Sequence, residues 1–179
     1  NLIMNIDLFI PCFIDQFYPE TGFSAVKILE KLGCKVNYNN KQTCCGQPSF
    51  NSGYIDETRK IAVKFVEDFK GVDYIVGPSA SCLGFVRNHY DSILKDTDSI
   101  KDFKSVKSRV FEFTDFLVNV LRVDDIGSEF NAKVTFHDSC SALREYKLKD
   151  QPRALLKKVK GLELIEMNEA RTHFRPPPT

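Results

Sequence analysis

The amino-acid sequence predicts an α/β fold with parallel strands and flanking helices. Short apolar segments with strand character alternate with longer segments whose apolar residues recur at helical spacing. Alternation of this kind favours a parallel sheet covered by helices. A cysteine follows each of the first three strand-like segments, so the cysteines are expected at the C-terminal ends of strands. With 179 residues, 42% of them hydrophobic, the chain is long enough to bury a core.

Three strand–helix pairs are expected in the first half of the chain. Residues 6–10 are apolar and bounded by Pro11, as in a short buried strand. Gly33 ends the first helix, because glycine is common just after a helix C-terminus. Asp56 is expected to cap a later helix that ends at Gly71. The expected strands are 6–10, 34–38 and 73–77, and the expected helices are 20–32, 56–71 and a segment through His89 and Tyr90.

The second half of the chain gives a weaker pattern. Residues 92–107 are polar with mixed charges and are interpreted as a linker or a surface helix. Residues 111–121 have apolar positions at helical spacing and predict one helix. A strand is expected at 133–136, a helix at 152–159 that ends at Gly161, and a last strand at 162–166.

Four cysteines are predicted to form one site. Cys12, Cys44, Cys45 and Cys82 all lie just after strand-like segments. Right-handed crossovers bring the ends of parallel strands to the same edge of a sheet, which is where α/β folds bind ligands. Gly46 supplies turn chemistry beside the adjacent thiols of Cys44 and Cys45. Phe13, Phe50 and Phe85 are expected in the core near this site, where they would limit access of water.

The chain also contains an incomplete internal repeat. Cys12 precedes Gly33 by 21 residues, and Cys140 precedes Gly161 by the same 21. This pattern predicts pseudo-repeated Rossmann-like units, at 4–105 and, incompletely, at 106–170. Cys140 lies 128 residues after Cys12. A shift of Cys44 and Cys45 by the same 128 residues predicts a second cysteine pair at 172 and 173, but the chain has Thr172 and His173 there. We therefore interpret 171–179, which includes three consecutive prolines, as an anomalous tail, and Cys140 as a possible remnant of a second site.

Composition excludes several classes of partner. Lys plus Arg is 25 and Asp plus Glu is 24, so the net charge of +1 gives no electrostatic case for binding nucleic acid. No apolar run approaches the roughly 20 residues of a membrane span, and the first residues lack the basic region of a signal peptide. We therefore expect a cytoplasmic protein. Thiols stay reduced in the cytoplasm, so the six cysteines are expected to be ligands, catalytic groups or buried fillers. Cys34, which opens a strand, is expected to be a buried filler.

Three stretches carry a resemblance to a known family. They are Gln42–Pro48 (Gln-Thr-Cys-Cys-Gly-Gln-Pro), Ser79–Cys82 and His137–Cys140. Together with the spacing from Cys12, they resemble the cysteine-rich CCG domain of heterodisulfide reductase B subunits, glycolate oxidase iron–sulfur subunits and, most closely, lactate-utilisation iron–sulfur subunits. Two departures are the serine at position 79, where some relatives have a further cysteine, and the missing second Cys-Cys-Gly.

The resemblance implies an electron-transfer subunit of a complex that oxidises a 2-hydroxy acid, for which L-lactate is the expected substrate. It implies a 4Fe–4S cluster bound by Cys12, Cys44, Cys45 and Cys82, and partners that are other subunits of a lactate or glycolate oxidation complex. No dinucleotide fingerprint or nucleophile elbow is present, so this chain is expected to conduct electrons and not to be the dehydrogenase. A homodimer is a further alternative.

The residues alone leave other interpretations of the cysteines open. Four thiolates suit structural zinc as well as an iron–sulfur cluster, and spacing does not separate the two. The cysteines could also be reduced structural residues of a scaffold without a cofactor. A thiol–disulfide function for Cys44 and Cys45 is the third alternative; it requires a strained ring between adjacent residues.

Overall fold

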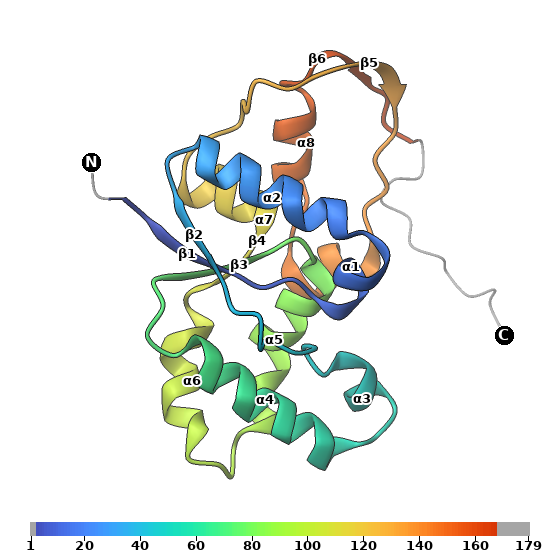
Figure 1. Cartoon of the computed structure of the whole chain (residues 1–179). Coiled ribbons are helices and arrows are strands. Elements are labelled where there is room, and N and C mark those ends of the chain that lie inside the picture. Colours follow the sequence, from blue (N-terminus) through green and yellow to red (C-terminus); the bar gives the residue numbers. More distant parts are fainter. Residues whose placement is uncertain (1–2, 168–179) are drawn as a thin grey trace, which may run out of the picture. The chain divides into compact units, whose positions relative to one another are not determined.

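The computed structural model in Figure 1 describes residues 3–167. The chain divides into two compact units, Asn1–Phe113 and Thr114–Thr179, which we call unit 1 and unit 2. Helices and parallel strands occur in both, which confirms the predicted α/β class. The repeat limits 4–105 and 106–170 stay a prediction, and the tail 171–179 lies outside the described residues.

Unit 1 is built on a parallel sheet with the strand order β2-β1-β3-β4. β1 pairs with β2 from Asn5↔Lys35 to Leu8↔Tyr38. The first three strands confirm the predicted ones. The strands are β1 (Asn5–Leu8), β2 (Lys35–Tyr38), β3 (Tyr74–Gly77) and β4 (Val110–Glu112). Because β1 lies between β2 and β3, the loops that leave these three strands start from neighbouring points on one edge of the sheet.

Helices cover both faces of this sheet. In Figure 1, α2 lies on one side of β1 and β3, and α4, α5 and α6 lie together on the other. The helices of unit 1 are α1 (Cys12–Phe17), α2 (Pro19–Lys31), α3 (Gln47–Asn51), α4 (Ile55–Phe69), α5 (Ala80–Ile93) and α6 (Ser99–Lys107). Helix α2 ends as predicted, and Gly33 follows it with the positive φ of 84° that favours glycine.

An aromatic core joins the sheet to α4 and α5. The ring centroid of Phe9 lies 5.1 Å from that of Phe65 and 6.0 Å from that of Phe69, both edge-on. Tyr90 packs edge-on against Phe65 at 5.6 Å, and all four residues are buried. Phe9 is the residue directly after β1, so this packing fixes the end of the strand from which Cys12 follows.

The sequence-based expectations for unit 1 were wrong for one helix cap and incomplete for several short elements. Asp56 does not cap α4; it lies in the first turn, where its carboxylate pairs with Arg59 at 2.7 Å. Of the two alternatives for 92–107, the surface helix is confirmed by α6, and the polar linker is wrong, because Phe103 and Val106 are fully buried beneath the charged face of this helix. The short helices α1 and α3 and the strand β4 were not expected, since segments of three to six residues carry little periodic signal.

Unit 2 contains a parallel pair of strands with short helices. The predicted strands are confirmed, with shifted limits, as β5 (Glu129–Val134) and β6 (Lys160–Leu164). The single helix expected at 111–121 is instead the strand β4 followed by a helical segment. The helical elements are α7 (Phe113–Asp115), the π-helical turns η1 (Phe116–Val120) and η2 (Ser141–Tyr146), and α8 (Asp150–Leu156).

Gly161 has a different role from the one its spacing predicted. It lies inside β6 and does not end a helix. Its φ is +80°, and a Cβ atom there would lie 1.8 Å from the Asn131 side chain on β5. Glycine is therefore required for the close approach of the two strands, and its match to Gly33 in spacing does not extend to structural position.

An ionic cluster holds unit 2 together. The guanidinium of Arg153 donates to both carboxylate oxygens of Asp138, at 2.6 and 2.9 Å, and to those of Glu166, at 2.7 and 3.1 Å. It also lies 5.2 Å from the ring centroid of Phe136. Asp138 is 2% exposed, so α8 is fixed to the segment after β5 by a buried, bidentate ion pair.

Candidate thiol site

The four predicted cysteines occupy the loops that leave three adjacent strands of unit 1. Cys12 begins α1 after β1, and Cys44 and Cys45 lie between β2 and α3. Cys82 lies in the first turn of α5 after β3. Since the three strands are parallel neighbours, these loops all leave the same edge of the sheet.

The thiols form a row of hydrogen bonds across this edge. The thiol of Cys12 donates to Cys44 Sγ at 3.5 Å. Cys45 is hydrogen-bonded through its side chain to both Cys44 and Cys82. The backbone N–H of Gly46 donates to Cys44 Sγ at 3.3 Å. The structure therefore brings together the four cysteines that the sequence singled out, while their joint role as ligands stays a prediction.

The row of contacts shifts the pKa of each thiol. Hydrogen bonding from Cys45, with that from Gly46, lowers the pKa of Cys44 to about 5. A hydrogen bond with Cys45 also lowers the pKa of Cys82. The pKa of Cys45 is raised, because it shares its proton with those two, and burial beside Cys44 raises the pKa of Cys12 to about 11. Cys44 and Cys82 are thus the thiols of the row whose surroundings favour deprotonation, and the thiolate is the form that binds metals.

The Cys44–Cys45 turn is fixed by the backbone conformation of Gly46 and by a hydrogen bond from Tyr90. Gly46 has a φ of +86°, a left-handed conformation that lets both adjacent thiols face the sheet edge. The hydroxyl of Tyr90, which is fully buried, donates to the carbonyl oxygen of Cys45 at 2.8 Å. Cys45 is itself only 1% exposed, whereas Cys12 is exposed. The row is therefore open to the surface at Cys12, most buried at Cys45 and half-buried at Cys44 and Cys82.

The chemistry of this donor set fits a thiolate-bound metal or cluster. Four sulfur ligands at one place are what both iron–sulfur clusters and structural zinc require. Within residues 3–167, no group of three or more His, Cys, Asp or Glu side chains is already arranged around a point where a metal ion could sit. The row must close into a compact group to share one centre, and the thiol contacts already bring its members together.

Comparison with known proteins identifies the family. Residues 6–87 and 134–174 match the cysteine-rich domain called CCG. The chain belongs to the CCG cysteine-rich domain family. It is 40% identical over 167 residues to "Lactate utilization protein A" of Geobacillus kaustophilus, covering 93% of this chain and 70% of that relative. It is 42% identical to "Lactate utilization protein A 1" of Bacillus mycoides, covering 92% and 67%, and 42% identical to "Lactate utilization protein A" of Shouchella clausii, covering 92% and 69%.

Two cysteines and one serine complete the description of the CCG positions. Cys34 is buried at 8% exposure just before β2, as expected of a filler. Cys140 lies in unit 2 and is exposed. Ser79, which stands where some CCG relatives were expected to have a further cysteine, caps α5 by accepting from the N–H of Cys82 at 3.4 Å. The serine thus fixes the turn that carries the fourth thiol.

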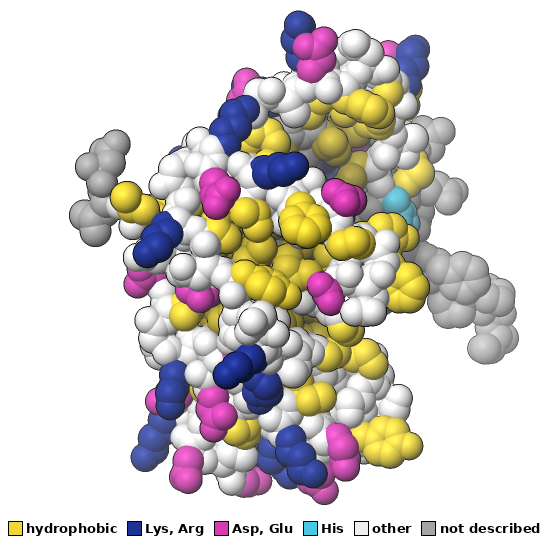
Figure 2. All heavy atoms as spheres, viewed as in Figure 1, with side chains coloured by type: hydrophobic (Ala, Val, Ile, Leu, Met, Phe, Trp, Pro, Cys, Tyr) yellow, Lys and Arg dark blue, Asp and Glu magenta, His cyan; other side chains and the backbone are white. Residues whose placement is uncertain are grey.

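One expectation about the surroundings of the thiols was wrong. Phe85 is buried and Phe50 packs on it with ring centroids 5.3 Å apart, but Phe13 is 58% exposed. Helix α1 buries none of its residues, and the ring of Phe13 packs against the exposed rings of Phe17 and Tyr18. Figure 2 shows hydrophobic side chains gathered on the face over α1 and α2.

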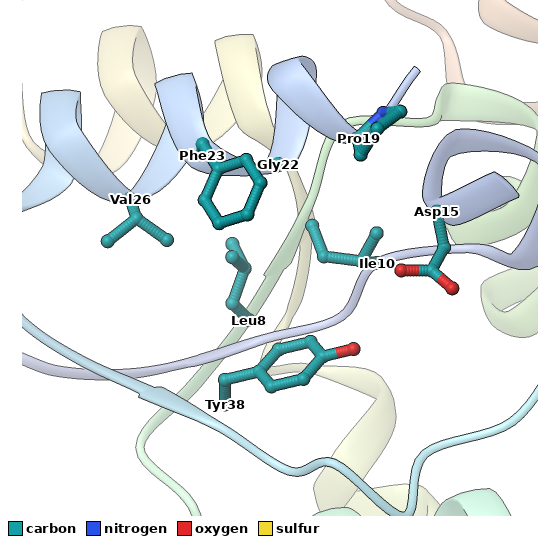
Figure 3. Close-up of a pocket in the computed structure, with 8 residues that line it drawn as sticks. All are labelled: Leu8, Ile10, Asp15, Pro19, Gly22, Phe23, Val26 and Tyr38. Carbon is teal, nitrogen blue, oxygen red and sulfur yellow. The ribbon is translucent and has the colours of Figure 1, made fainter. Parts of the chain in front are cut away.

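An apolar pocket of about 470 Å³ opens on this same face (Figure 3). Ile10 and Asp15, which flank Cys12 in the chain, line it together with Leu8, Pro19, Gly22, Phe23, Val26 and Tyr38. Burial, with the nearby Asp15 carboxylate, raises the pKa of the Tyr38 hydroxyl.

Among the described residues, no helix is both long enough and apolar enough to cross a membrane.

Sequence reasoning missed the polar groups that hold the thiol loops. Gln42, Gln47, Ser81 and Tyr90 all hydrogen-bond to these loops, and none was predicted to do so. The available signal was the placement of the two glutamines on either side of Cys44-Cys45-Gly46. It could not be interpreted without knowing which strand ends lie beside the turn.

Proposed function

We propose that this chain is an iron–sulfur electron-transfer subunit of a complex that oxidises L-lactate or a related 2-hydroxy acid. A 4Fe–4S cluster would be held by Cys12, Cys44, Cys45 and Cys82. The observation that carries the proposal is the meeting of four thiols from three strand ends at one edge of the sheet. The lactate-utilisation names of the relatives support the substrate class. The proposal includes partner subunits and the reducing cytoplasm, where thiols stay available as ligands.

The residues of the site have distinct parts in this function. A 4Fe–4S cluster, when bound, accepts and releases single electrons. The lowered pKa values of Cys44 and Cys82 favour the deprotonation that metal binding requires of a thiol. Cys45 lies in the interior, where its surroundings exclude water, and Cys12 lies at the surface. Electrons would therefore enter and leave on the side of Cys12, where a partner subunit can approach.

Metal analysis of protein purified without oxygen tests this proposal. We expect about four irons and four sulfides per chain, with the visible absorbance of a cluster. Cys45→Ser should lose them, and Cys34→Ser is the control, because Cys34 is also buried but lies outside the thiol row. Zinc near one per chain would instead support the structural zinc alternative. A folded, colourless protein that cannot be reconstituted with iron and sulfide would overturn the proposal.

A further inference from the structure

Two glutamines flank the thiol turn symmetrically. Gln42 lies two residues before Cys44, and Gln47 lies two residues after Cys45. Both side chains are half-buried and turn back towards loops that carry the other two cysteines. Their contacts join the thiol-bearing loops in pairs.

Gln42 joins the loop of Cys44 to the end of β1. Its Oε1 accepts from the N–H of Ile10 at 2.8 Å, and its Nε2 donates to the carbonyl of Leu8 at 3.2 Å. Nε2 also donates to the carbonyl of Asn39 at 3.1 Å. The last backbone pair of β1 and β2 is Leu8↔Tyr38, so the amide continues the sheet pairing one step further with a side chain. Ile10 is two residues from Cys12.

Only an amide can make this set of contacts. The N–H of Ile10 needs an acceptor, and the carbonyls of Leu8 and Asn39 need donors. A carboxylate offers acceptors alone, so a glutamate of the same shape would point negative oxygen atoms at two carbonyls. A side chain at position 42 must therefore carry both a donor and an acceptor, and the right size alone is not sufficient.

Gln47 makes the corresponding connection on the other side of the turn. Its Oε1 accepts from the hydroxyl of Ser81 at 2.7 Å. Ser81 directly precedes Cys82, and Gln47 follows Cys45 by two residues. This contact requires only an acceptor at position 47, which glutamine and glutamate both provide.

We propose that Gln42 and Gln47 are positioning residues for the four thiols. Gln42 holds Cys12 beside Cys44, and Gln47 holds Cys45 beside Cys82. The reason for holding the thiols rests on the proposed function, because four ligands of one metal centre must be kept at fixed separations. The positioning itself can be measured in cluster-free protein, so it is tested separately.

The test measures how fast each thiol pair closes to a disulfide in reduced, cluster-free full-length protein treated with diamide. Two S–H bonds break, one S–S bond forms, and two electrons and two protons reduce the N=N bond of diamide to a hydrazine. Peptide mapping identifies the linked pair. Gln42→Glu should slow closure of Cys12–Cys44 about tenfold, the size of effect expected when a hydrogen bond is lost and its partners are left unpaired.

The two glutamines should respond differently to the same substitution. Gln47→Glu should leave both closures unchanged, whereas Gln47→Leu should slow only Cys45–Cys82. Gln16→Glu is the matched surface control, because Gln16 is exposed and its side chain donates to the neighbouring Asp15 carboxylate at 3.2 Å. Gln42→Met, which removes the amide without adding charge, should behave as Gln42→Glu does. Resistance of Cys34 to alkylation shows that each variant is folded.

Wild-type closure rates in folded Gln42→Glu and Gln42→Met would overturn the positioning role, whatever the metal content. Slowed disulfide formation in variants of a protein that never binds iron would support the positioning role of Gln42 and reject the proposed cluster. With a cluster bound, Gln42→Glu and Gln42→Met should both shift the spectroscopic signature or midpoint potential relative to wild type, as a changed ligand geometry requires.

Discussion

Unit 1 and unit 2 each place a cysteine after a parallel strand, but they surround it differently. In unit 1, three neighbouring strands end at one edge, and Cys12 meets Cys44, Cys45 and Cys82 there. In unit 2, β5 pairs with β6, and Cys140 is the only cysteine in the sequence of that unit. The shared strand-and-cysteine pattern is therefore not sufficient for a site; the neighbouring strands must also carry thiols.

The two units also differ in what fixes the cysteine-bearing segment. Neutral hydrogen bonds from Gln42, Gln47 and Tyr90 hold the thiol loops of unit 1. In unit 2, the charged group of Arg153 fixes Asp138, two residues before Cys140. Neutral groups beside the thiols add no charge of their own next to a bound iron–sulfur cluster. The ion pairs of Arg153 are suited instead to a structural role. The following predictions test this difference.

Arg153→Met should produce the largest effect, and only in unit 2. Removing the guanidinium leaves the Asp138 carboxylate buried without its charge partner, which costs about 3–5 kcal/mol. The partners of Arg153, which are Phe136, Asp138, Lys149 and Glu166, all belong to unit 2. Hydrogen exchange followed by mass spectrometry should show faster exchange in peptides from 129–167 and unchanged exchange around Cys44.

The double variant Arg153→Met with Asp138→Leu is the control for this prediction. It replaces both members of the ion pair with apolar groups and should recover much of the lost stability, because no unpaired charge remains buried. Loss of iron in the single variant, to the extent seen with Cys45→Ser, would contradict the separation of the two units. Protection of 129–167 equal to wild type would show that the ionic cluster does not hold unit 2.

Tyr90→Phe should have an intermediate effect, and Tyr146→Phe is its counterpart in unit 2. Tyr90 donates to the carbonyl of Cys45 in the fully buried core, so its loss should cost about 1–3 kcal/mol. Tyr146 donates to Asp115 at 2.7 Å, and that carboxylate is only half-buried, so water can replace the hydroxyl and the cost should be smaller. Urea unfolding measures both; equal losses would contradict the dependence on burial.

Much of unit 1 could be predicted from the sequence, because its strands are apolar and its cysteines mark the strand ends. The convergence of Cys12, Cys44, Cys45 and Cys82 followed from parallel topology alone. Unit 2 was harder, since its strands are largely exposed and its helical turns are short. The spacing of Gly161 matched that of Gly33, but only coordinates show that the glycine makes room for Asn131.

The site contacts that sequence did not predict all connect residues far apart in the chain. Gln42 contacts Leu8 of β1, 34 residues earlier, and Tyr90 contacts the thiol turn 45 residues before it. A polar side chain carries no sequence signal for which distant backbone group it will meet. The CCG resemblance named the thiols, but the residues that hold them could be found only from the geometry.

The smallest predicted effect is a pH dependence of opposite sign in the two units. Hydrogen bonds from Arg153 lower the pKa of Glu166 below its ordinary 4.5, so the folded state binds its proton less readily than the unfolded state. Glu166 therefore stabilises unit 2 above its ordinary pKa, and this contribution is lost as the pH falls through the lowered value. Burial raises the pKa of Asp7 in unit 1 above 3.8, so protonation of Asp7 favours folding and stability is gained as the pH falls through the raised value. Urea unfolding between pH 6 and 3, followed by NMR signals of each unit, should show Glu166→Gln and Asp7→Asn removing slopes of opposite sign; slopes of the same sign would contradict the assignment.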